Sequence, residues 1–224
     1  MRSKDLKKVP WLIAILIVFS ISIFYFPFSN KKIVGAEPSI EKNCYSSEEF
    51  NPLIVYYSRS GKTRMVANTL KDQLSCGVTE IKSTRDREGF FGIFTCVLDQ
   101  LLDRDDQIES FKKDLKGYNP IIIASPIWIG KLSSPARTFI KQVKLQGKEV
   151  YMVITYNGRL NEEKENILKE NITSKGIDLK RLYKIVTKEK TAEDIRKEIS
   201  NQLAKRPVLM KKIIISKAMV TDKY

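Results

Sequence analysis

The chain has 224 residues, of which 40 are Lys or Arg, 26 are Asp or Glu, three are Cys and none is His. This length allows one domain of ordinary size with a full hydrophobic core. The lack of histidine excludes Ser-His and Cys-His catalysis and histidine-bound metals, and the three cysteines lack the CxxC spacing of a zinc site, so we expect no metal centre.

The net charge of +14 lies mainly at the two ends of the chain. Residues 1–36 carry a net charge of +5 and residues 180–224 carry +8, whereas residues 37–179 carry only +1. A protein that binds nucleic acid through its phosphates places basic residues over one face of its fold. The nearly neutral central region therefore argues against nucleic acid as a partner.

The N-terminal region contains a candidate membrane anchor. No charged residue occurs from Val9 to Asn30, and the 18 residues from Trp11 to Phe28 are almost wholly apolar. As a helix they would span about 27 Å, close to the hydrocarbon thickness of a bilayer. We therefore expect residues 1–30 to form one transmembrane helix of a single-pass cell-membrane protein in contact with lipid. The alternative is a signal peptide cleaved after Val34-Gly35-Ala36, which would give a secreted domain. The flanking charges leave the side of the membrane open.

Residues 31–51 are polar and predict a tether. From residue 52 onward, short apolar runs alternate with apolar residues at helical spacing. One of these helices is marked by the apolar residues Phe94, Val97, Leu98 and Leu101. We predict five strands, each followed by a helix, at residues 53–57, 78–81, 121–124, 150–154 and 182–186.

Polar residues at the predicted helix starts indicate caps. We expect Ser134 to cap the helix after the third strand, with Pro135 in its first position. Asn161 should cap the next helix, and Thr191 with Asp194 should form a capping box for the last one.

The alternation of strands and helices predicts an α/β fold, a doubly wound parallel sheet with helices on both faces. Strands one, three and four are continuous apolar runs, as expected of central strands, whereas strands two and five are short or alternating, as expected of edges. This favours a five-stranded sheet in the order 2-1-3-4-5 over residues 52–204. The basic and apolar extension at 205–224 would add either a further strand or an interfacial helix.

The loops after strands one, three and four are the candidate binding site. Ligands of such a sheet bind beyond the carboxyl ends of the strands, where the strand order reverses. The first loop leads directly into a helix N-terminus, whose free N–H groups suit a phosphate, although an ordinary strand–helix turn would look similar. A nucleotide-triphosphate loop is excluded, because Tyr56 stands where its first glycine is required and strand three does not end in an aspartate for magnesium.

Together the three loops resemble those of the flavodoxin family. The spacing Ser58-x-Ser60-Gly61-x-Thr63 resembles the family's phosphate loop for flavin mononucleotide (FMN). Residues 124–135 and 153–158 resemble the two loops that flank the flavin ring, so the resemblance extends over about residues 52–204. It implies a flavodoxin-like fold, noncovalently bound FMN, and electron transfer or oxidoreduction carried out by the flavin without a catalytic side chain.

The resemblance also implies the binding residues. Those of the phosphate loop are Ser58, Arg59, Ser60, Gly61, Lys62 and Thr63, with Arg59 and Lys62 acting through their backbone N–H groups. Those beside the ring are Ser125, Pro126, Ile127, Trp128, Ile129, Gly130 and Lys131 in one loop and Tyr156, Asn157 and Gly158 in the other.

The chain differs from the family's soluble electron carriers, which resemble acidic proteins that dock on basic partners. Here the domain is nearly neutral, its tail is basic, and an apparent anchor precedes it. We therefore expect a membrane-tethered flavoprotein whose partner is a redox protein or a quinone. Two alternatives stay open: an FMN or quinone reductase that uses NAD(P)H, and a tethered interaction module without flavin. Whether the protein is an enzyme or a carrier is also open.

Overall fold

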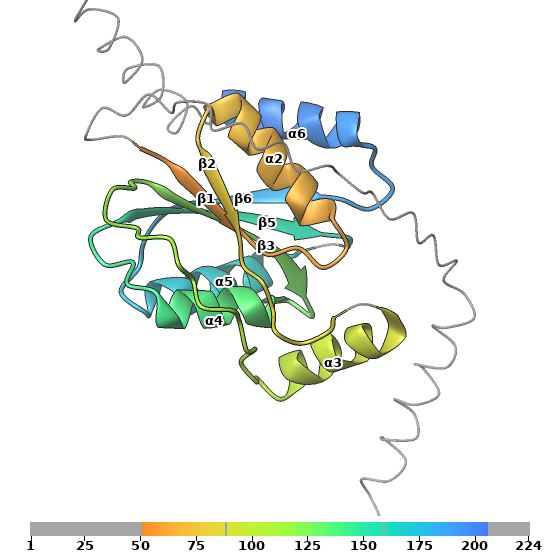
Figure 1. The fold of residues 1–224 in the computed structure, drawn as a ribbon. Helices are drawn as coiled ribbons and strands as arrows, with labels where there is room; N and C mark the ends of the chain where they lie inside the picture. Colours follow the sequence, from red (N-terminus) through yellow and green to blue (C-terminus); the bar gives the residue numbers. More distant parts are fainter. Residues whose placement is uncertain (1–50, 88, 159, 206–224) are drawn as a thin grey trace, which may run out of the picture. The chain divides into compact units, whose positions relative to one another are not determined.

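The computed structural model describes residues 51–87, 89–158 and 160–205 (Figure 1). All the described residues belong to one compact unit of the chain. The expected anchor, nearly all of the tether and the extension beyond residue 205 lie outside the described residues. Within the described ranges, none of the helices has the length and apolarity that crossing a bilayer requires.

The strands form one sheet in the order that the sequence predicts. Its path is β2-β1-β3-β5-β6, and each neighbouring pair on this path is parallel. Counted without the short β4, this is the order 2-1-3-4-5, with the weakly apolar second strand and the alternating last strand at the edges. The strands are β1 (Leu53–Tyr56), β2 (Gly77–Glu80), β3 (Ile121–Trp128), β4 (Lys131–Leu132), β5 (Glu149–Tyr156) and β6 (Asp178–Val186).

The prediction of five strands is wrong by one short strand. We expected the third strand to end at Ala124, but β3 continues to Trp128 and pairs antiparallel with β4, the pair Ile127 and Leu132 being in register. Ser125 and Pro126 interrupt the apolar run, which is why the sequence predicts an end there. The backbone nevertheless stays extended beyond the sheet edge, because β4 folds back to provide its hydrogen-bond partner.

Two helices cover each face of the sheet, and α3 stands apart from both pairs (Figure 1). Alternate residues of the strands point to opposite faces. Ile54 and Ile122 pack with α2 and α6, whereas Val55 and Ile123 pack with α4 and α5. The helices are α2 (Lys62–Leu74), α3 (Gly89–Leu101), α4 (Ser134–Gln142), α5 (Glu162–Thr173) and α6 (Ala192–Lys205).

Two of the three predicted caps are confirmed. The Asn161 side chain accepts a hydrogen bond from the backbone N–H of Lys164, and Thr191 and Asp194 bond reciprocally as a capping box. The cap of α4 is wrong by one residue, because Ser133 is the N-cap and Ser134 is the first helical residue. The backbone N–H of Ser133 donates to the Pro126 carbonyl at 3.0 Å. This bond closes the hairpin of β3 and β4 and places Ser133 just before the helix.

The buried phenol of Tyr151 predicts a loss of stability at high pH. Burial raises its pKa from 10.0 to about 12, so the unfolded chain loses this proton before the folded protein does. The protonated phenol therefore stabilises the folded protein fully below pH 10. As the pH rises to 12 this stabilisation is lost, and the free energy of unfolding falls by about 1.4 kcal/mol per pH unit. Urea unfolding of wild type and Tyr151→Phe over this range should therefore show a flatter decline for the variant. Parallel declines would contradict the prediction.

Candidate functional site

The first loop presents the open N-terminus of α2. Gly61 is the N-cap, with φ of 84°, and no side chain caps the helix. A Cβ at Gly61 would meet no atom within 4 Å, so no neighbouring residue packs against the N-cap at that point. The unpaired N–H groups of such a turn and the positive end of the helix dipole favour a bound anion.

Ser58 provides a test of whether a phosphate fits this loop. Its Oγ atom is buried and has no hydrogen-bond partner among the described residues. Buried hydroxyl groups almost always have a partner, so an atom without one beside an uncapped helix indicates that a ligand supplies it. Ser60 is exposed in the same loop and is free to contribute a second hydroxyl. The donors present fit a phosphate monoester.

Other residues predicted to bind the phosphate have structural contacts. The Thr63 hydroxyl is buried and lies 2.7 Å from the hydroxyl of Thr155. The Lys62 ammonium donates to the Thr187 carbonyl at 3.0 Å, and the Arg59 guanidinium donates to the Arg87 carbonyl at 3.5 Å. The side chains of Lys62 and Arg59 are therefore engaged within the fold, and a contact of their backbone N–H groups with a phosphate stays a prediction.

The second loop is the β3–β4 hairpin. Its turn residues Ile129 and Gly130 have φ of 49° and 77°, as in the two-residue turns that suit the twist of paired strands. Ser125, predicted to bind the cofactor, is fully buried, and its hydroxyl lies 3.0 Å from that of Ser133. Ser125 therefore holds the base of the hairpin.

Two further residues of this loop have partners of their own. The Trp128 ring packs edge-on against Tyr57, with their centroids 5.7 Å apart, so the aromatic pair joins the first loop to the second. The Lys131 ammonium bonds to the Asp103 carboxylate at 3.0 Å and to the Gln100 carbonyl at 3.3 Å. It is therefore engaged with the end of α3. Pro126, Ile127 and Gly130 are half-buried along the hairpin.

Ile129 is strained, because its β-branched side chain disfavours a left-handed backbone. We expect Ile129→Gly to raise the free energy of unfolding by about 1 kcal/mol, as measured by urea unfolding. The matched control is Ile129→Ala, which also removes the side chain but keeps a Cβ in the unfavourable region, and should give a smaller gain. Equal gains in the two variants would assign the effect to the apolar side chain instead.

The third loop follows β5 and is fastened to the end of β6 by Thr187. The backbone N–H of Thr187 donates to the Tyr156 carbonyl at 2.9 Å, and its hydroxyl donates to the Asn157 side-chain oxygen at 3.0 Å. Burial raises the pKa of the Tyr156 phenol. Asn157 and Gly158 are exposed at the sheet edge.

Sequence reasoning named neither Thr155 nor Thr187 as a site residue, although Thr155 lies within the predicted loop 153–158. Thr155 binds the Thr63 hydroxyl, and Thr187 holds both Lys62 and Asn157. Their positions at the carboxyl ends of the last two strands were the available signal, because those ends meet at the same edge as the three predicted loops.

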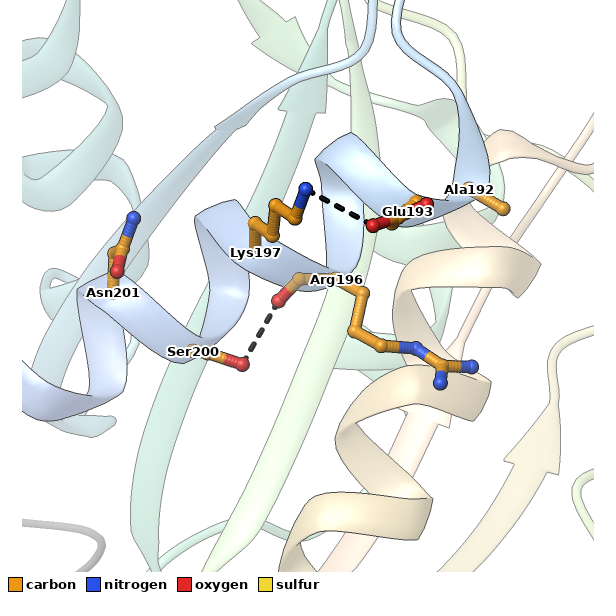
Figure 2. A pocket seen from close by; sticks show the side chains of 6 residues that line it. All are labelled: Ala192, Glu193, Arg196, Lys197, Ser200 and Asn201. Carbon is orange, nitrogen blue, oxygen red and sulfur yellow. Dashed lines mark hydrogen bonds and ion pairs between the residues drawn. The ribbon is translucent and has the colours of Figure 1, made fainter.

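A shallow depression lies on the exposed surface of α6 (Figure 2) and includes none of the loop residues above. Two of its side chains pair with neighbours on the same helix: Lys197 with Glu193 at 3.0 Å, and Ser200 with the Arg196 carbonyl at 3.0 Å. We assign it no part in the site. Among the described residues, no group of three or more Cys, Asp or Glu side chains could hold a metal ion.

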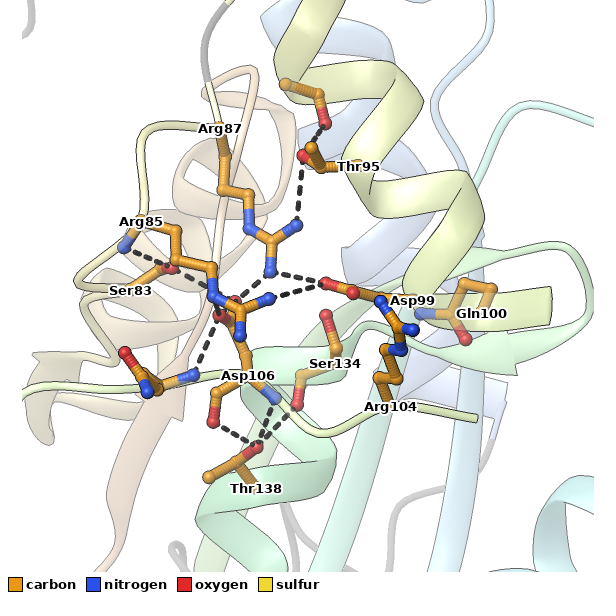
Figure 3. Close-up of polar contacts among 12 residues, drawn as sticks. Ser83, Arg85, Arg87, Thr95, Asp99, Gln100, Arg104, Asp106, Ser134 and Thr138 are labelled. Carbon is orange, nitrogen blue, oxygen red and sulfur yellow. Dashed lines mark hydrogen bonds and ion pairs between the residues drawn. The ribbon is translucent and has the colours of Figure 1, made fainter. Parts of the chain in front are cut away.

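A buried ion network lies beside α3 (Figure 3). The Arg87 guanidinium, 4% exposed, lies 2.6 Å from the Asp99 carboxylate and 2.8 Å from that of Asp106. Burial alone lowers the pKa of Arg87, but hydrogen bonds to the two carboxylates raise it above its ordinary value. Ser83 also donates to Asp106, at 3.0 Å, and Arg85 lies within 3.7 Å of it. The network joins the β2–α3 loop, α3 and the segment before β3.

Solved structures of other proteins have a fold similar to that of this chain, although no match by sequence was found. No protein-family model matches the sequence, and no curated protein matches it. A flavoprotein from Lactobacillus acidophilus, solved in complex with FMN, is 24% identical, with a TM-score of 0.53, over 60% of this chain and 93% of that one. A protein from Bacteroides uniformis described as a flavoprotein is 20% identical, with a TM-score of 0.53, over 68% of this chain and 99% of that one.

A protein from Bacteroides eggerthii with the same description is 20% identical, with a TM-score of 0.51, over 67% of this chain and 96% of that one. These similarities extend over nearly the whole of each neighbour, and the sheet order is that of flavodoxin. The chain has a flavodoxin-like fold. The loops of this flavodoxin-like domain at the β1, β3 and β5 ends therefore occupy the switch point at which such folds bind ligands.

Proposed function

We propose that the flavodoxin-like domain binds FMN noncovalently and carries out electron transfer or oxidoreduction with it. The observation that carries this proposal is the buried, unpartnered Ser58 hydroxyl beside the uncapped N-terminus of α2. Both lie at the switch point between β1 and β3. The flavoprotein from L. acidophilus that shares the fold was solved in complex with FMN, which supports the choice of cofactor.

The residues fit distinct roles towards FMN. Ser58, Ser60 and the N–H groups of the first turn of α2 would hold the phosphate. The hairpin with Trp128 and the loop with Tyr156 would flank the ring, provide apolar and aromatic contact, and exclude water. When bound, FMN supplies the redox chemistry, and the chain contributes binding, orientation and control of its surroundings.

The partners belong to the same proposal. The apolar segment from Trp11 to Phe28 supports a single-pass anchor in the cell membrane, with a secreted domain as the alternative. An anchored domain would meet membrane redox proteins and lipid-soluble quinones, and quinone reduction is the reaction that we propose. The side of the membrane that the domain faces decides whether NAD(P)H can be the donor.

The test is a pair of titrations with the full chain in detergent, one with FMN and one with riboflavin. Riboflavin has the same ring but no phosphate. We expect FMN to bind more tightly by at least about 100-fold, because each hydrogen bond to a charged phosphate contributes about 1.5–3 kcal/mol. Equal affinities would overturn the phosphate site, and absence of binding would overturn the proposal.

The electron donor is tested on the loaded protein. Rapid-mixing absorption measurements with NADPH, NADH and dithionite would separate a reductase from a carrier, because only a reductase accepts electrons quickly from a nicotinamide. Bleaching by dithionite alone would assign the protein to the carrier class. Reoxidation by a lipid-soluble quinone would then identify the acceptor class.

A further inference from the structure

Helix α3 has its polar side inward and its apolar side outward. Its buried residues are Gly92, Cys96, Asp99 and Gln100, which follow one another at i, i+4, i+7 and i+8 along one side of the helix. Phe90, Phe91, Phe94 and Leu101 lie on the other side and are exposed. A surface helix ordinarily shows the opposite arrangement, with its apolar side against the core.

Specific contacts fix this orientation. On the inner side, Asp99 pairs with the buried Arg87, and the Gln100 amide donates to the Leu132 carbonyl at 3.2 Å. A Cβ at Gly92 would lie 2.2 Å from the backbone of Arg87, so only glycine allows the helix to approach that segment so closely. These contacts on the inner side of α3 therefore leave its apolar side facing outward.

The exposed apolar residues gather in one region of the domain. Phe91 is 80% exposed and Leu101 61%, and Phe90 packs edge-on against Phe91 with centroids 5.9 Å apart. Ile129 extends the region onto the hairpin, which Lys131 ties to the end of α3. Of the seven exposed large apolar side chains in the described part of the chain, six lie here: Phe90, Phe91, Phe94, Leu101, Leu102 and Ile129. We call these six residues the α3 patch.

We propose that the α3 patch binds the lipid bilayer, with α3 lying in the plane of the membrane interface. Phenylalanine and leucine on one side of a helix are typical of interfacial helices, which enter the bilayer to the level of the acyl chains. The one charged residue of α3, Asp99, is buried and paired, so no charge on the helix opposes entry. A group of exposed large apolar side chains on a folded domain marks an interaction site.

Two observations favour lipid over a second copy of the chain. The first rests on the anchor proposed above: a bilayer holding Trp11 to Phe28 is separated from Asn51 by only 22 residues, which reach no more than about 75 Å when fully extended, so the bilayer stays within reach of the domain. The second is the small size of the α3 patch. One side of a 13-residue helix, about 20 Å long and about 10 Å wide, offers an area on the order of 200 Å², which is less than the roughly 800 Å² per partner that stable protein interfaces bury.

Binding of α3 to the membrane would also position the proposed flavin site. The hairpin that carries Ile129 also carries Trp128, which belongs to the proposed ring pocket. A domain resting on α3 would therefore hold its flavin site at the membrane surface. A lipid-soluble quinone could then reach the flavin without leaving the bilayer.

The test places a tryptophan in the α3 patch and asks whether lipid quenches it. The reporter is the full chain with Trp11→Phe and Phe91→Trp, in phosphatidylcholine vesicles with and without bromine on the acyl chains. The Trp11→Phe variant alone measures the emission of Trp128, which is then subtracted from that of the reporter. Brominated lipid should lower the emission of the residue-91 indole by about twofold or more. The matched control carries Trp11→Phe with Ser200→Trp on α6, a helix that covers the sheet at a distance from α3 (Figure 1), and should lose little emission.

A second variant tests the apolar character of the α3 patch. Adding Leu101→Asp to the reporter places a charge on this exposed side and should restore the emission to that of the α6 control. Equal quenching at positions 91 and 200, or quenching that survives Leu101→Asp, would overturn the inference. Unquenched reporter in a chain that cross-links as dimers would overturn it in favour of a second copy. FMN titration of the same samples decides the proposed function separately, because the phosphate loop does not contain these positions.

Discussion

Replacing Arg87 with methionine is expected to lower the free energy of unfolding by about 3–5 kcal/mol. The guanidinium lies between the carboxylates of Asp99 and Asp106, and all three side chains are buried. Methionine keeps much of the volume but leaves two buried carboxylates close together, and in the described part of the chain the cation that still pairs with them is the half-exposed Arg85. Removal of one partner from a buried network is destabilising mainly because of the charge that stays behind.

Urea unfolding of full-length variants would measure this loss. The matched control is Arg64→Met, which removes an exposed ion pair with Glu80 and should change stability by about 1 kcal/mol or less. A second comparison adds Asp99→Asn and Asp106→Asn to Arg87→Met, which removes the uncompensated charges and should recover a large part of the loss. If Arg87→Met resembles Arg64→Met, the network is not a determinant of stability.

The sheet was predictable because its signals are local and consistent. Continuous apolar runs identified the central strands at Ile54 and Ile122, and both are almost fully buried in the structure. The alternating run ending at Val186 was correctly read as an edge strand. Each signal depends on residues next to one another in the chain, so sequence alone was sufficient.

The orientation of α3 was not predictable in the same way. The apolar spacing of Phe94 and Leu101 correctly indicated a helix, but a periodic pattern does not state which side faces the core. That choice depends on Arg87 and on Gln100, whose partners Asp106 and Leu132 lie far along the chain or in another element. Long-range polar contacts of this kind leave no local pattern.

The candidate site was predictable in place but less so in detail. The three loops meet at one sheet edge because parallel strands bring their carboxyl ends together. Hydroxyl content alone, however, could not distinguish Ser58, whose Oγ has no partner among the described residues, from Ser125 and Thr63, which bond to other hydroxyls in the interior. The difference lies in packing against Ser133 and Thr155, and the sequence spacing carries no information on it.

Ser60→Glu is expected to abolish the preference for FMN over riboflavin. Ser60 is exposed in front of the α2 N-terminus, so a glutamate there meets open space and a favourable helix dipole, and the fold should keep its stability. The new carboxylate would occupy the position proposed for the phosphate. Juxtaposition of like charges costs several kcal/mol, which predicts a loss of FMN affinity of about 100-fold or more.

Three comparisons make this result specific. Riboflavin has no phosphate, so its affinity should change little in Ser60→Glu, and the two flavins should then bind about equally. Ser60→Ala removes one hydroxyl without adding charge and should weaken FMN by only about tenfold, the effect of one hydrogen bond to a charged group. Ser200→Glu adds the same charge on the exposed surface of α6 and should leave both affinities unchanged. Because these variants differ in charge and position but not in burial, undiminished FMN binding by Ser60→Glu would place the phosphate elsewhere.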